Sequence, residues 1–180
     1  MGKRSDFPRL KSDGYYSPVS VLTPLLPFLK DGGDFIEPCA GDGRLIRWLE
    51  LYGMRCVQWF DINPGDLFIP WGDALDAPLR PGTRTITNPP WTRQILHPLI
   101  DRFRRNGETW LLFDAAWSHT VQARAYLPYC SDIVSVGRVR WIDGTEHSSK
   151  DDAAWYRFQA ERCVTVFHNF AHTYRWNYAR

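Results

Sequence analysis

The residues of this chain that could carry out chemistry are concentrated in two short loops, each directly after an apolar stretch. The first loop holds Gly41 and Gly43, between an apolar stretch that ends at Glu37 and a predicted helix over 44–52. Glycines permit tight turns and let a ligand approach the backbone closely. A strand, a glycine turn and a helix N-terminus together are typical of a nucleotide-type site at the carboxyl edge of a sheet.

The second loop is Asn88-Pro89-Pro90-Trp91, which follows a predicted buried strand over 83–87. Two prolines directly after a strand cannot continue its hydrogen-bond ladder, and they fix the backbone rigidly. Such a loop holds one side-chain amide and one backbone carbonyl in a single geometry. A purely structural turn could use the same two prolines, so the loop points to a site only in combination with the glycine loop.

Two carboxylates follow further apolar stretches. Asp61 ends a predicted strand over 55–60 and follows Gly43 at close to the offset of about 20 residues at which an acid reaches a ribose hydroxyl in strand–helix–strand nucleotide folds. Asp73 follows a shorter apolar stretch and could accept a hydrogen bond from an adenine amino group. The alternative for either residue is a strand-end carboxylate that only faces water.

Composition indicates one globular domain. The chain has 180 residues, 44% of them hydrophobic and 23% charged, and its formal charge of +2 does not require a polyanionic partner. The four cysteines stand far apart without a C-x-x-C pair, which favours reduced thiols over a disulfide framework or a zinc site. No apolar run approaches membrane-spanning length, and we expect a cytoplasmic protein.

The elements around these loops predict how the chain is divided. We expect a flexible basic arm over 1–13, either a solvated tail or a phosphate-contacting segment, and a single domain over 14–180 without a separate target-recognition domain. Apolar residues at helical spacing over 19–29 predict a short or broken helix, because Pro24 and Pro27 interrupt it. Ser17 would be its N-cap and Pro18 its first helical residue.

The second half of the chain predicts a helix that ends near Asn106-Gly107, a buried strand, another helix and a strand-rich end. The expected ranges are 95–103 and 118–127 for the helices, 110–113 and 133–142 for a buried and an outer strand, and 155–158 with 163–167 for a closing antiparallel pair. Strands that alternate with helices indicate a parallel sheet covered on both faces. The predicted fold class is therefore α/β, a Rossmann-like three-layer sandwich with a mostly parallel sheet and an antiparallel C-terminal hairpin.

Taken together, the stretch from Glu37 to Gly43, Asp61, Asp73 and Asn88-Pro89-Pro90-Trp91 resemble class I S-adenosylmethionine-dependent methyltransferases. Within that class the chain is similar to the short, phage-type adenine-N6 DNA methyltransferases, over residues 14 to 168. A stretch from Ser148 to Tyr156 also looks like a late motif of the phage relatives. The resemblance implies S-adenosylmethionine as cofactor, S-adenosylhomocysteine as product and DNA as partner. It places the following residues at the cofactor: Tyr16, Ser17, Pro18, Glu37, Pro38, Cys39, Ala40, Gly41, Gly43, Asp61, Ile62, Asp73, Ala74 and Asn88.

The resemblance also implies the catalytic residues, which are Asn88, Pro89, Pro90 and Trp91. The lone pair of an aromatic amine is delocalised into its ring, so the amine is a poor nucleophile. The Asn88 side-chain oxygen and the Pro89 carbonyl would accept the two amino hydrogens and favour a pyramidal nitrogen, while Trp91 would stack on a flipped-out base. The methyl group sits on a sulfonium, which is a good leaving group, so no metal is required.

Alternatives remain open at this point. Because the chain has no room for a target-recognition region, its specificity would be short, relaxed, or supplied by an oligomer or a partner. The same Asn-Pro-Pro-aromatic loop occurs in RNA and protein-glutamine methyltransferases. A non-catalytic binding protein that retains the fold is a further alternative. His168 and His172 are four residues apart, but no third metal ligand is evident.

Overall fold

The computed structural model describes residues 17–141 and 150–169 of the chain. The predicted arm over 1–13 and the predicted cofactor contact Tyr16 lie outside the described residues. The same holds for Ser148 and Ser149 of the late motif and for His172.

The centre of the fold is a seven-stranded sheet with the order β2-β1-β3-β4-β6-β5-β7. Within this sheet only β6 runs antiparallel to its neighbours, β4 and β5. The strands are β1 (Gly33–Glu37), β2 (Met54–Trp59), β3 (Arg84–Thr87), β4 (Thr109–Asp114), β5 (Cys130–Arg138), β6 (Asp152–Phe158) and β7 (Val166–His168).

The side of the sheet to which successive strands are added changes at β1. β2 is added on one side of β1, and β3 and then β4 are added on the other side. In open α/β sheets such a switch point leaves a crevice outside the carboxyl ends of the two strands, and ligands bind there. The glycine loop follows β1 and Asn88 follows β3, so both predicted loops stand at this switch point.

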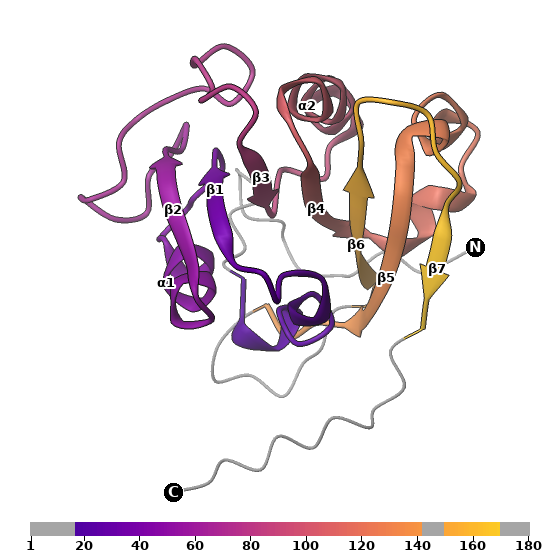
Figure 1. Ribbon diagram of the computed structural model, residues 1–180, viewed down its shortest axis with the longest axis horizontal. Coiled ribbons are helices and arrows are strands. Elements are labelled where there is room, and N and C mark those ends of the chain that lie inside the picture. Colours follow the sequence, from indigo (N-terminus) through magenta and orange to yellow (C-terminus); the bar gives the residue numbers. More distant parts are fainter. Residues whose placement is uncertain (1–16, 142–149, 170–180) are drawn as a thin grey trace, which may run out of the picture.

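Helical segments cover both faces of the sheet and make three layers. Figure 1 shows the strands from β2 at the left to β7 at the right, with α2 (Arg93–Asn106) above them and α1 (Arg44–Leu51) below. The strand β4 is buried along both faces, since Trp110 and Leu112 join the core on the α1 side and Leu111 and Phe113 join the core on the α2 side. The predicted three-layer α/β fold class is confirmed.

The helix α1 follows directly from its sequence pattern. Leu45 and Leu49, one turn apart, are both buried, and Gly43 precedes the helix with a φ of 75° that favours glycine. The helix ends at Leu51, and Gly53 follows in a left-handed conformation with a φ of 87°. The predicted helix over 44–52 and its glycine stop are therefore confirmed.

Two predicted helices differ from the structure. The segment 19–29 forms the short 3₁₀-helices η1 (Val19–Val21) and η2 (Leu26–Phe28), as its prolines predict, but Pro18 is an extended residue before η1 and Ser17 caps nothing. The predicted helix over 118–127 is wrong. Its place is taken by three 3₁₀-helices, η3 (Ala115–His119), η4 (Gln122–Ala125) and η5 (Leu127–Tyr129), because the extended backbone of Thr120 interrupts the helical run.

The strand pairing at the C-terminal end also differs from the prediction. The expected pair over 155–158 and 163–167 does not form, because β6 pairs with β4 and β5 and the short β7 pairs in parallel with β5. The antiparallel C-terminal pair consists of β5 and β6 instead. The strand predicted over 133–142 ends at Arg138, after a register shift beside Gly137, and β7 rather than β5 is the edge of the sheet.

Candidate active site

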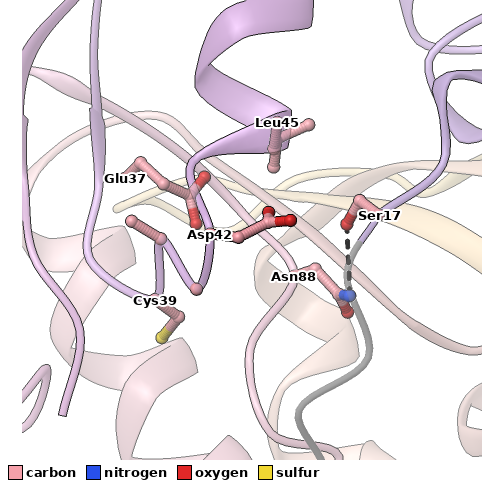
Figure 2. A pocket seen from close by; sticks show the side chains of 8 residues that line it. Ser17, Glu37, Cys39, Asp42, Leu45 and Asn88 are labelled. Atoms are coloured by element: carbon pink, nitrogen blue, oxygen red, sulfur yellow. Dashed lines mark hydrogen bonds between the residues drawn. The ribbon is translucent and has the colours of Figure 1, made fainter. Parts of the chain in front are cut away.

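The two predicted loops come together around one pocket at the carboxyl ends of β1 and β3. Figure 2 shows the side chains that line it, which come from three separate segments of the chain: Ser17, Glu37, Cys39, Asp42, Leu45 and Asn88. Ala40 and Gly41 add their backbone to the lining. The structure therefore unites six of the residues that sequence places at the cofactor: Ser17, Glu37, Cys39, Ala40, Gly41 and Asn88.

The glycine loop has a backbone that only glycine adopts easily. The φ angles of Gly41 and Gly43 are 55° and 75°. A Cβ on Gly43 would also stand 3.3 Å from the Cδ1 atom of Ile69. The Asp42 carboxylate closes the loop onto α1, because its Oδ1 accepts the Arg44 backbone N–H at 3.0 Å and its Oδ2 pairs with the Arg44 guanidinium at 2.8 Å.

Asp61 fastens this loop to the segment after β2. Its Oδ2 accepts the backbone N–H of Gly41 at 2.8 Å, and its Oδ1 accepts that of Asn63 at 2.7 Å. A second bond runs between the same two segments, from the Gly65 N–H to the Gly41 carbonyl at 2.9 Å. An ionised carboxylate has about four acceptor sites, so these two bonds leave Asp61 able to accept from a ligand as well.

The remaining predicted cofactor residues lie behind or beside the loop. Asp73 holds a turn, because its Oδ1 accepts the Leu75 N–H at 2.8 Å, and Ala74 is buried in the core on the α2 side. Burial raises the pKa of the Cys39 thiol well above its usual value, and the nearby charges of Glu37, Asp61 and Asp73 add to this effect. Asp73 therefore stands near the pocket. Ile62 is 58% exposed and lies outside the pocket lining.

Glu37 is the buried ionisable group of the pocket. Its side chain is only 1% exposed, and its Oε1 accepts the Thr87 hydroxyl at 2.6 Å. Its Oε2 is buried without a hydrogen-bond partner among the described residues. Burial raises the pKa of Glu37 well above its usual value, the Thr87 bond opposes this rise, and the Asp61 charge adds to it. A buried carboxyl oxygen without a partner in a pocket wall fits a polar group of a ligand.

The second loop places Asn88 across the pocket from the glycine loop. Its Nδ2 donates to the Ser17 hydroxyl at 3.2 Å, the dashed contact in Figure 2. Its Oδ1 accepts the indole N–H of Trp91 at 3.2 Å, and the same N–H also reaches the Leu112 carbonyl at 3.2 Å. Pro89 is buried, and Pro90 and Trp91 are half-buried.

Three contributions were missed by the sequence analysis. Asp42 and Leu45 line the pocket, and Thr87 binds Glu37. The last strand residue before Asn88 must face either the pocket or the core, so strand alternation could have found Thr87. Asp42 lies between Gly41 and Gly43, but the sequence contains no signal that separates an acid that caps a helix from one that binds a ligand.

The structure holds no metal centre in the part that it describes. Within residues 17–141 and 150–169, no three His, Cys, Asp or Glu side chains are grouped so as to hold a metal ion. His168 instead contacts the Asp132 carboxylate at 2.8 Å. None of the described helices is long and apolar enough to cross a membrane.

Comparisons with known proteins add evidence on the fold. No protein-family model matches the chain, and no curated protein matches it. Among solved structures, the 23S rRNA methyltransferase ErmE superposes with a TM-score of 0.52 and 13% identity, covering 82% of this chain and 70% of that one. The PH0226 protein of Pyrococcus horikoshii gives a TM-score of 0.49 and 13% identity over 78% of this chain and 89% of that one. The similarity to ErmE is one of fold alone: the chain shares the Rossmann-like α/β fold of that rRNA methyltransferase.

Proposed function

We propose that this protein transfers a methyl group from S-adenosylmethionine to the exocyclic amino group of adenine in DNA. The observation that carries the proposal is the position of the Asn88 carboxamide. It follows β3 at the switch point of the sheet, on a loop stiffened by two prolines, and it faces the glycine loop across one pocket. Reaction and cofactor sites that meet at such a point are what a methyl transfer between two bound molecules requires.

The residues present fit S-adenosylmethionine. The left-handed backbone at Gly41 and Gly43 would admit its methionine part, and the unpartnered Oε2 of Glu37 offers a hydrogen-bonding group in the same wall. Asp61 stands beside the glycine loop, where a ribose hydroxyl would meet it, and Asp73 lies near Cys39. When bound, the cofactor supplies a methyl group on a sulfonium, a good leaving group.

The role of the protein in this reaction is to orient and to accept hydrogen bonds. The Asn88 Oδ1 and the Pro89 carbonyl would accept the hydrogens of the target amino group and direct its lone pair towards the methyl group. Because the methyl group would leave a sulfonium, this step would require neither a covalent intermediate nor a metal. Positioning and fixed dipoles then account for the rate.

RNA is the second candidate substrate. The observation that favours it is the fold likeness to a 23S rRNA methyltransferase. An exocyclic amino group is presented by adenine in both nucleic acids, so the site chemistry is the same, and the surfaces that bind the strand must make the distinction.

The proposal is tested by transfer of labelled methyl from S-adenosylmethionine to duplex DNA, followed by digestion to nucleosides and mass analysis. We expect N6-methyldeoxyadenosine among the nucleosides of the digested DNA. The variant Asn88→Ala should lose transfer by about 100-fold or more and retain cofactor affinity, because the carboxamide acts on the reacting amine. Methylated RNA with unlabelled DNA would move the assignment to RNA. No cofactor binding in calorimetry, or normal turnover by Asn88→Ala, would overturn the proposal.

A further inference from the structure

The Asn88 carboxamide contacts one side chain from a distant part of the chain and one from its own loop. Its Nδ2 donates to Ser17 Oγ, which lies 71 residues earlier, and its Oδ1 accepts from Trp91 Nε1, both at 3.2 Å. A carboxamide can adopt two orientations that exchange oxygen and nitrogen, and its hydrogen-bond partners decide between them. Ser17 and Trp91 therefore both bear on the direction of the Asn88 oxygen.

Trp91 is the partner that decides the orientation. An indole N–H is a donor only, so it requires the carboxamide oxygen opposite it, whereas the Ser17 hydroxyl can donate or accept and would tolerate either orientation. A half-turn of the carboxamide would set its NH₂ group against the indole N–H and lose that bond. The oxygen therefore faces Trp91 and the nitrogen faces Ser17.

The Trp91 indole is itself fixed in place. Its N–H is shared with the Leu112 carbonyl of β4 at 3.2 Å. Its ring meets Trp141 edge-on, with 5.7 Å between the ring centroids and 81° between the planes. It also packs against the buried cores on both faces of the sheet. A side chain held by a backbone carbonyl, an aromatic neighbour and two cores transmits a defined geometry to the group that it binds.

We propose that Trp91 is a positioning residue that aims the Asn88 carboxamide oxygen at the target amino group through its indole N–H. The inference rests on the proposed methyl transfer at Asn88. It differs from the stacking role that the sequence resemblance assigns to Trp91, because the determining atom is Nε1 rather than the ring face. Each role predicts a different effect of replacing the indole by a phenyl ring.

The experiment compares Trp91→Phe with Trp48→Phe and the wild type. Trp91→Phe keeps an aromatic ring and removes the donor, whereas Trp48→Phe removes an indole N–H that has no hydrogen-bond partner among the described residues. We expect Trp91→Phe to lower kcat for methyl transfer by about tenfold with KM for S-adenosylmethionine and for DNA unchanged, the effect of losing one positioning hydrogen bond. Trp48→Phe should retain the wild-type kcat.

Two outcomes overturn the inference. If the wild type is active and Trp91→Phe keeps its kcat, or raises only KM for DNA, Trp91 acts as a stacking surface and the methyl-transfer proposal stands. If the wild type transfers no methyl group to DNA or RNA, the proposed function fails and this inference fails with it.

A second measurement covers the case that Trp91→Phe does not fold. In the ¹⁵N–¹H spectrum of the otherwise intact Asn88→Ala variant, the assigned Trp91 indole resonance should shift and its hydrogen should exchange faster than in the wild type. The Trp48 indole resonance should stay in place. An unchanged Trp91 resonance would overturn the inference, because it would show that the indole and the carboxamide do not interact.

Discussion

The Asp61 carboxylate accepts one backbone N–H from each of two loops, Gly41 from the glycine loop and Asn63 from the loop after β2. A residue that the sequence suggests as a ribose contact or as a water-facing carboxylate therefore holds the glycine loop in place. Hydrogen bonds to a charged acceptor are stronger than neutral ones, at about 1.5–3 kcal/mol each. The same side chain thus contributes to stability and to the proposed cofactor site.

We expect Asp61→Ala to weaken S-adenosylmethionine binding and to lower the free energy of unfolding by about 2 kcal/mol, because both N–H groups lose their acceptor. Asp61→Asn keeps one acceptor oxygen and should lose less. Calorimetric titration and urea unfolding measure the two effects, and Asp76→Ala, an exposed acid in the same connection, is the control. Full stability of Asp61→Ala would contradict the bridging role.

Glu37 should give the protein a pH dependence that runs opposite to that of a carboxylate held in an ion pair. Burial raises its pKa in the folded state well above the ordinary value of 4.5, so the folded protein keeps a proton that the unfolded chain releases. Stability from this group is fully present below the unfolded pKa and is lost as the pH rises towards the folded one, by up to about 1.4 kcal/mol per pH unit.

Glu37→Gln cannot ionise and should remove this loss. Urea unfolding at pH 5 and pH 8 should therefore show the variant gaining stability relative to the wild type at the higher pH. A wild type and a variant that respond equally to pH would show that Glu37 ionises freely in the fold.

At the scale of the elements, α2 is docked to η3 by a pair of rings. The Trp117 indole N–H donates to His97 Nε2 at 3.0 Å, so that nitrogen must be unprotonated. Burial, followed by the charge of Arg93, lowers the pKa of His97 below its ordinary value of 6.5. A lowered pKa means that this contribution to stability is present above pH 6.5 and is lost as the pH falls through the folded-state pKa.

The prediction is that thermal stability falls between pH 7 and pH 5 in the wild type and falls less in His97→Gln, which keeps an acceptor but cannot titrate. His119→Gln, an exposed histidine of η3, serves as the matched control. An identical acid response of the wild type and His97→Gln would exclude His97 as its source.

Local pattern was sufficient for the strands and helices that bury a continuous apolar face. Leu45 and Leu49 mark α1, and the run from Trp110 to Phe113 marks β4. The pattern failed over 118–127, because successive 3₁₀ turns also bury single apolar residues such as Trp117 and Ala123. The partners of β6 and β7 were missed because strand pairing depends on tertiary contacts that alternation along one strand does not encode.

The candidate site divides in the same way. Loop positions such as Gly41 and Asn88 follow from strand ends and can be placed by sequence alone. The bonds of Asp61 to Gly41 and of Asn88 to Ser17 link segments whose distance in space only the fold determines. The orientation of the Asn88 carboxamide follows from its contact with the indole N–H of Trp91, which can only donate. The sequence contains both residues, but only the structure shows that they are in contact.

At the scale of the whole molecule, a chain of ion pairs and hydrogen bonds joins residues in or next to five adjacent strands, at the strand ends opposite the site. Arg84 pairs with Glu108 at 2.6 Å, and Glu108 also pairs with Arg157. Arg157 pairs with Asp132 at 3.4 Å, and Asp132 with His168 at 2.8 Å. Glu108 is the member that contacts two guanidinium groups. Its loss leaves two partly buried cations without their central partner.

We expect Glu108→Gln to lower the free energy of unfolding by about 2–3 kcal/mol. KM for S-adenosylmethionine should stay unchanged, because the site lies at the opposite ends of the strands. Urea unfolding and methyl-transfer kinetics measure the two quantities, with the exposed Glu161→Gln as control. A change in KM without a change in the free energy of unfolding would contradict this prediction and would show that Glu108 affects the candidate site.

The place of β6 in the sheet has a consequence for folding during translation. β2, β3 and β4 each pair with a strand that has already been made. β5 pairs only with β6 and β7, which are both synthesised after it, and β6 lies between β4 and β5. At about 5–20 residues per second, the ribosome needs a few seconds to pass from Cys130 to Phe158. During this interval the half of the sheet that carries the glycine loop and Asn88 can be complete, while the edge of β4 is still open. A nascent chain of this protein therefore presents an unpaired, apolar strand edge to chaperones, or to the nascent chain of a neighbouring ribosome, before its own β6 emerges.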